Sequence, residues 1–122
     1  MDARSLARLQ SLGRLGLGAG LMVVPGVVGG GWVGGVADKR DGQALAIGLG
    51  ARDVALALGA MRALGSGRGA GAWVRAGMLA DAADLVATLR ARDSLPPLAV
   101  PAVAAIAGGS LLLGAWLQSA VD

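Results

Sequence analysis

The chain has 122 residues, of which 55% are hydrophobic and only 16% are charged, and its mean hydropathy is +0.65. A small soluble domain needs more charged residues to cover its surface, so the composition predicts an integral membrane protein of one domain. The absence of Cys, His, Tyr and Phe excludes disulfides, zinc–thiolate sites, haem attachment and imidazole catalysis. The formal net charge is only +3 and the arginines are dispersed, which argues against nucleic-acid binding.

The N-terminal segment is basic and leads into an uncharged stretch between Arg14 and Asp38, which is long enough to cross the hydrocarbon core. Because Pro25-Gly26 is a stop signal for a helix, we predict a first membrane helix over about residues 6–24. Residues 25–42 are then predicted to be a glycine-rich interfacial segment, which contains Trp32, followed by a loop. The alternative is a single helix that continues to about Ala37.

Three further helices are predicted over about residues 43–64, 71–91 and 97–121. The last is uncharged as far as Val121, which makes it the safest transmembrane prediction. The middle two are long enough to span a membrane but contain charged residues, namely Arg52, Asp53, Arg75, Asp81 and Asp84. We therefore predict an all-α fold, an integral membrane four-helix bundle with short loops that forms a single domain over residues 1–122.

Most charges of the two middle helices lie among small residues. At helical spacing, one face of residues 43–64 contains Gly48, Arg52, Ala55 and Gly59, and Asp53 lies on a second small-residue face beside it. One face of residues 71–91 contains Gly77, Asp81, Asp84 and Thr88. Small residues let helices approach closely. We therefore expect these charges to point into the bundle, with Arg52 within salt-bridge reach of Asp81 or Asp84.

Ionisable residues inside a membrane are costly and indicate a functional site by default. We predict a buried polar centre in which Asp81 or Asp84 is a general acid, Asp53 is the second carboxylate and Arg52 is the orienting cation. The expected ligand is a lipophilic small molecule, and the reaction classes are isomerisation, cyclisation and epoxide opening. No cofactor is expected, and no metal, because the aspartates lack the further oxygen ligands that a divalent cation needs.

Three other interpretations fit the same residues. In the first, the charges form an interhelical salt-bridge cluster that fixes helix register and binds no ligand. In the second, the small-residue faces, which are more numerous than one bundle needs, pack against other chains, as in a homo-oligomer or a non-enzymatic accessory subunit of a larger membrane complex. In the third, a proton-linked transporter uses the carboxylates.

The basic residues give a slight orientation bias. On the side of the termini lie Arg4, Arg8, Arg14, Arg62 and Arg68, and on the opposite side lie Lys39, Arg40, Arg90 and Arg92. The positive-inside rule then predicts a multi-pass protein of the cell membrane with both termini in the cytoplasm.

One motif resembles a known family. The segment GARDVALALG (Gly50 to Gly59) follows an arginine-led helix that ends near Pro25 and precedes the sequence D-A-A-D (Asp81 to Asp84). This pattern, over about residues 12–120, resembles the DoxX-like four-helix membrane proteins, a family of unknown function. The resemblance implies a four-helix fold with a polar centre made of Arg52, Asp53, Asp81 and Asp84, and it implies no particular reaction.

Overall fold

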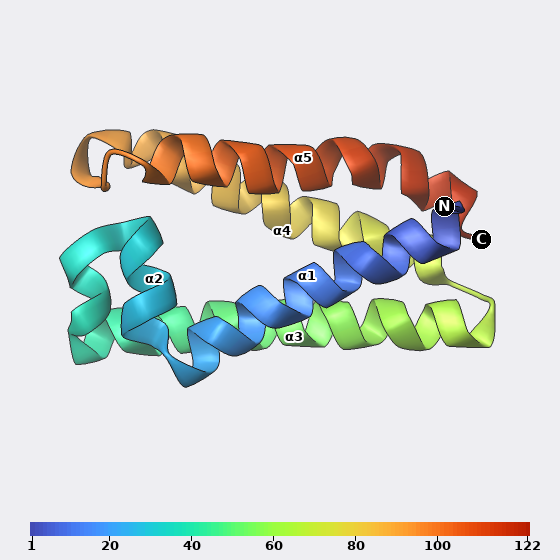
Figure 1. The fold of residues 1–122 in the computed structure, drawn as a ribbon, viewed down its shortest axis with the longest axis horizontal. Helices are drawn as coiled ribbons and strands as arrows, with labels where there is room; N and C mark the ends of the chain where they lie inside the picture. The colour runs from blue at the N-terminus through green and yellow to red at the C-terminus, as the bar shows by residue number, and fades with distance from the viewer.

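The computed structural model describes all 122 residues, and every regular element in it is helical (Figure 1). The five α-helices are α1 (Ala3–Val23), α2 (Pro25–Val33), α3 (Arg40–Ser66), α4 (Ala70–Arg90) and α5 (Ala99–Ala120). Two short 3-10 segments, η1 (Gly34–Asp38) and η2 (Arg92–Ser94), complete the chain. The predicted all-α fold is therefore confirmed.

The long helices are arranged as two pairs. In Figure 1, α4 and α5 form one layer, and α1 crosses diagonally over α3 in the other. Helix α2 lies at one end of the molecule, beside the start of α3, and the two termini lie together at the opposite end. The fold thus has a fifth helix, and it is not the simple four-helix arrangement that the sequence predicts.

The first helix ends where the sequence predicts a break. Val24 has non-helical backbone angles (φ −130°, ψ 62°), and the chain bends by 108° between Ala3–Val23 and Pro25–Asp38. Pro25 occupies the first turn of α2, where its fixed φ suits a helix and its missing N–H costs nothing. The proline therefore ends one helix and begins another.

Residues 25–42 differ most from their predicted structure. They were expected to be a glycine-rich interfacial segment and a loop, whereas the structure forms α2, η1 and the start of α3. The glycines that disfavour a helix in isolation allow close packing in this one. Gly29 is buried on α2, where a β-carbon would lie 3.3 Å from Ala37 and 3.6 Å from Ala46.

Two glycines shape the turn between α3 and α4. Helix α3 ends before Gly67 and α4 begins after Gly69, and both glycines have a φ of 79°. A left-handed glycine just after a helix is a common stop. The turn brings α4 back beside α3, which places residues from the middle of each helix at similar depth.

A hydrophobic core lies at the end of the molecule where the termini meet. It contains Leu64, Leu117 and Val121 together with small residues of α1, α3 and α4. The Arg4 side chain donates hydrogen bonds to the carbonyls of Leu64 and Val121, at the ends of α3 and α5. The guanidinium group thereby satisfies carbonyls that a helix C-terminus leaves without an intrahelical partner.

Many large apolar side chains face outward. Leu45 of α3, Leu79 of α4 and Leu112 of α5 are each more than 70% exposed, whereas most buried hydrophobic residues are alanines. A soluble monomer rarely exposes so much contiguous apolar surface. The interior is therefore packed through small residues, and the outside suits lipid or another apolar surface.

Two helices, α3 and α5, are long and apolar enough to cross a membrane, and the bent pair α1–α2 counts as a third if it is one broken span. Helix α4, which contains Arg75, Asp81 and Asp84, is not among these candidates.

Candidate functional site

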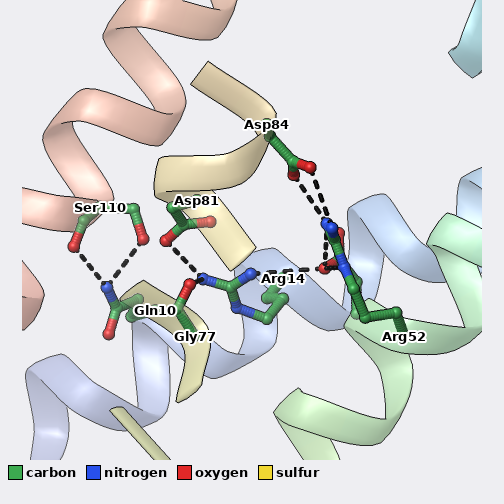
Figure 2. Close-up of polar contacts among 8 residues, drawn as sticks. Gln10, Arg14, Arg52, Gly77, Asp81, Asp84 and Ser110 are labelled. Carbon is green, nitrogen blue, oxygen red and sulfur yellow. Dashed lines mark hydrogen bonds and ion pairs between the residues drawn. The ribbon is translucent and has the colours of Figure 1, made fainter. Parts of the chain in front are cut away.

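Five charged side chains from three helices form one ion-pair network, which we call the Arg/Asp cluster: Arg14 of α1, Arg52 and Asp53 of α3, and Asp81 and Asp84 of α4. Figure 2 shows the two guanidinium groups between the carboxylates of α4 and the other helices. All four residues predicted from the sequence, Arg52, Asp53, Asp81 and Asp84, thus lie together. A fifth member, Arg14, was not predicted.

Arg52 is held by the bidentate ion pair that is typical of buried arginines. Its Nη1 lies 2.9 Å from Oδ1 of Asp84 and its Nη2 lies 2.7 Å from Oδ2 of the same carboxylate. Its Nη2 also donates to Oδ1 of Asp53 at 3.0 Å. The prediction that Arg52 reaches Asp81 or Asp84 is therefore confirmed for Asp84.

Arg14 connects the other two aspartates. Its Nη2 lies 2.6 Å from Oδ2 of Asp81, and its Nη1 lies 3.4 Å from Oδ1 of Asp53. The Gly77 carbonyl accepts a further hydrogen bond from Nη2, and a β-carbon at Gly77 would lie only 3.2 Å from that nitrogen. The small residue one turn before Asp81 thus leaves room for the guanidinium of Arg14.

Sequence reasoning assigned Arg14 to the basic residues that orient the chain in the membrane. A signal for its true place was present in the spacing of α1. Ala7, Ser11 and Gly18 are buried on this helix, and Arg14 shares their face because the intervals are four, three and four residues. An arginine on the small-residue face of a helix has the same pattern that identified Arg52.

The Arg/Asp cluster has an excess of negative charge. Three carboxylates face two guanidinium groups, so its formal charge is −1. The side chains of Arg14, Asp53 and Asp81 are only 10–12% exposed, and Arg52 is more open at 30%. An uncompensated charge in such a setting is unfavourable, so the cluster favours a positively charged group beside it.

Two carboxylate oxygens of the cluster have no protein partner. Asp53 accepts hydrogen bonds only at Oδ1, and Asp81 only at Oδ2. No fully buried side-chain oxygen or nitrogen lacks a hydrogen-bond partner, so the other oxygen of each carboxylate reaches accessible space. These two oxygens are free to interact with a ligand.

The carboxylates border a cavity of about 580 Å³, which we call the α1–α5 cavity. Asp53, Asp81 and Asp84 all line it, together with Arg14. Its apolar lining comes from α1, α2 and α5 and includes Leu17, Leu21, Val28, Val103 and Ile106. Its volume and its mixture of apolar walls with a few polar groups are typical of small-molecule sites.

Two polar contacts involve residues that line the α1–α5 cavity. Gln10 Nε2 of α1 donates to the carbonyl and hydroxyl oxygens of Ser110 of α5, at 3.1 and 2.9 Å (Figure 2). Trp32 Nε1 of α2 donates to the Thr88 hydroxyl of α4 at 2.8 Å. Gln10, Ser110 and Trp32 all line the cavity, so each contact fixes part of its wall.

The Arg/Asp cluster and the α1–α5 cavity together form the candidate site, which joins carboxylates to an apolar space. Comparison of the chain with protein-family models, curated proteins and solved structures finds no match.

Proposed function

We propose that this protein lies in the cell membrane and binds a lipophilic small molecule in the α1–α5 cavity. The observation that supports this most directly is the meeting of apolar walls with three carboxylates in one cavity of about 580 Å³. The apolar body of the ligand packs against α1, α2 and α5, and its polar group faces Asp53 and Asp81.

The membrane setting of this proposal has its support in the outer surface. Exposed leucines on α1, α3, α4 and α5 suit contact with lipid. The Arg/Asp cluster pairs Arg52, Asp53, Asp81 and Asp84 between the helices, whereas Arg75 of α4 is exposed. We propose that these four helices make a transmembrane bundle. With Arg14 in the Arg/Asp cluster, the other basic residues divide four against four between the two sides and give no orientation.

Filling the α1–α5 cavity is expected to block the ligand. Gly31 of α2 lines the cavity and has no atom within 4 Å of an added β-carbon, so Gly31→Leu is expected to place its side chain in the ligand's space. We expect photolabelling of the cavity by a long-chain alcohol with a diazirine to weaken about tenfold, which is roughly 1.4 kcal/mol of binding free energy. The sites of labelling are mapped by mass spectrometry of the protein in nanodiscs.

The adjacent glycine provides the matched control. Gly30 also has open space around it but does not line the cavity, so Gly30→Leu should label as the parent does. Gly13→Leu and Gly16→Leu repeat the comparison on α1. Of these two glycines, Gly13 lines the cavity and Gly16 does not. Equal labelling of the parent, Gly31→Leu and Gly13→Leu would show that the lipophile lies elsewhere, and the proposed site would be wrong.

We propose acid catalysis on the bound molecule as a second function, because Asp81 lines the cavity and has one oxygen without a protein partner that can carry a proton. Protonated Asp81 adds its proton to an alkene carbon or an epoxide oxygen of the ligand. In an isomerisation or cyclisation the resulting cation then loses a different proton, which restores the acid. Asp53 is the second carboxylate, Asp84 anchors Arg52, and Arg52 orients Asp53.

The catalytic proposal predicts that Asp81→Asn abolishes turnover of an alkene or epoxide substrate while the diazirine alcohol still labels the cavity. An amide cannot donate an acidic proton, but it keeps the shape of the side chain. Product formation is followed by mass spectrometry. Unchanged turnover in Asp81→Asn would exclude the acid role and leave the binding function in place.

A further inference from the structure

The charged residues that line the α1–α5 cavity have a larger negative net charge than the Arg/Asp cluster as a whole. Of the five charged residues, Arg52 does not line the cavity, whereas Asp53, Asp81, Asp84 and Arg14 do. Arg52 pairs with Asp53 and Asp84 from outside this space. A ligand in the cavity therefore faces three carboxylates and one guanidinium group.

The guanidinium group of Arg14 is already engaged, and two carboxylate oxygens are not. Arg14 contacts Asp53, Asp81 and the Gly77 carbonyl. The second oxygens of Asp53 and Asp81 have no protein donor, although both side chains are about nine-tenths buried. The charged atoms of the lining that have no protein partner are thus carboxylate oxygens, which select a positive group or a strong hydrogen-bond donor.

The remaining lining of the cavity suits an apolar body around that positive group. Leu17, Leu21, Val103 and Ile106 supply apolar walls, and Trp32, whose indole N–H is held by Thr88, adds an aromatic side chain to the lining. An aromatic ring attracts a cation by its quadrupole. The volume of about 580 Å³ is far larger than the roughly 30 Å³ of one water molecule, so a small inorganic cation does not fill it.

We infer that the ligand of the α1–α5 cavity is a lipophilic monocation, such as an amine, ammonium or phosphonium group with an apolar body. This inference rests on the proposed function that the cavity binds a lipophile, and it adds the charge of the ligand. One positive charge offsets the formal charge of −1 on the Arg/Asp cluster. A cation formed in place by proton transfer from Asp81 meets the same carboxylates.

Two ions of matched size and shape test the sign of the charge. Tetraphenylphosphonium and tetraphenylborate are titrated separately against the full chain in nanodiscs of zwitterionic lipid, and empty nanodiscs correct for partition into lipid. We expect the parent protein to bind the phosphonium at least about tenfold more tightly than the borate, which is roughly 1.4 kcal/mol. This comparison needs no variant, so it does not depend on any substitution being folded.

A charge-matched pair of variants assigns the preference to the cavity. Asp81→Asn removes one negative charge from the cavity lining, and Asp93→Asn removes the same charge from an exposed turn outside it. We expect Asp81→Asn to lose most of the phosphonium preference and Asp93→Asn to retain it. Equal losses in the two variants would mean that the overall charge is responsible, which overturns the inference.

The outcomes separate this inference from the proposed function. Equal binding of the two ions, or tighter binding of the borate, overturns the cation inference, whereas cavity labelling by the neutral diazirine alcohol continues to support a lipophile site. If neither ion binds and the alcohol does not label the cavity, both the cation inference and the proposed function are wrong.

Discussion

Replacement of Arg14 by alanine is expected to lower the free energy of unfolding by about 3–5 kcal/mol, the range found when one partner of a buried ion pair is removed. Arg14 is the only cation that contacts Asp81, and it also contacts Asp53. Asp53 and Asp81 are both buried. Without Arg14, Asp81 has no positive partner, and Arg52 remains paired with Asp53 and Asp84 only, so three carboxylates face one guanidinium group. Thermal or chemical unfolding in detergent micelles measures the loss.

Three comparisons identify the cause of that loss. Arg8 is exposed on the same helix and makes no side-chain hydrogen bond or ion pair, so Arg8→Ala should remain within about 0.5 kcal/mol of the parent. Arg52→Ala should cost less than Arg14→Ala, because the Arg52 side chain is 30% exposed. Addition of Asp81→Asn to Arg14→Ala should recover part of the stability. If Arg14→Ala unfolds like the parent, the cluster is solvated and its charges do not stabilise the fold.

The part of the site contributed by α3 and α4 is predictable because it follows from helical spacing. Arg52 and Asp84 lie at similar depth on consecutive helices that a short turn joins. The predicted small-residue face of Arg52 is only partly buried, because Gly48 and Ala55 are exposed, and the buried face of α3 is that of Asp53. The Arg52–Asp84 ion pair at 2.7 Å follows from this spacing and from the short turn. The choice of Asp84 over Asp81 was not predictable, because both lie on one face and Arg14 occupies the position beside Asp81.

The partners of Arg14 depend on tertiary structure that helical periodicity does not encode. Its partners lie 39 and 67 residues away in the sequence. An arginine ahead of an apolar run usually orients a membrane helix, and that local rule gave the wrong role here. The buried face of α1 becomes visible in the sequence only when Arg14 is considered together with Ala7, Ser11 and Gly18.

Helix α2 and the cavity that it helps to line could not be predicted from the sequence either. Intrinsic propensity disfavours a helix with several glycines, but propensity is a weak prior that packing overrides. Here Gly29 packs against Ala37 and Ala46, and the 108° bend places Trp32 beside Thr88. The α1–α5 cavity results from that bend and from the crossing of the helix pairs, neither of which a single sequence specifies.

The second large loss of stability is expected from a substitution at the crossing of α1 and α3. Gly18 and Gly50 meet at this crossing, and a β-carbon on Gly50 would lie 2.5 Å from the Gly18 carbonyl oxygen and 2.9 Å from the Leu21 β-carbon. Neither atom is the far end of a flexible side chain, so the helices must move apart to admit it. We expect Gly50→Ala to destabilise the protein by about 1–3 kcal/mol in the same unfolding assay, the usual cost of overpacking.

Gly48→Ala provides a control of opposite sign. Gly48 lies on the same helix with nothing within 4 Å of an added β-carbon, so alanine there should stabilise the protein by up to about 1 kcal/mol through helix propensity. If Gly50→Ala were as stable as Gly48→Ala, the two helices would not be in backbone contact at this point.

The same crossing sets the geometry of the Arg/Asp cluster. Arg14 lies one turn before Gly18, and Asp53 lies one turn after Gly50, so a separation of α1 from α3 lengthens the 3.4 Å contact between Arg14 and Asp53. Gly50→Ala should therefore weaken the Arg14–Asp53 contact, which Arg14→Ala removes altogether. We expect the double variant to be destabilised by less than the sum of the two single losses, because substitutions that share a contact are not additive. Full additivity would show that the glycine contact and the ion pairs stabilise the fold independently.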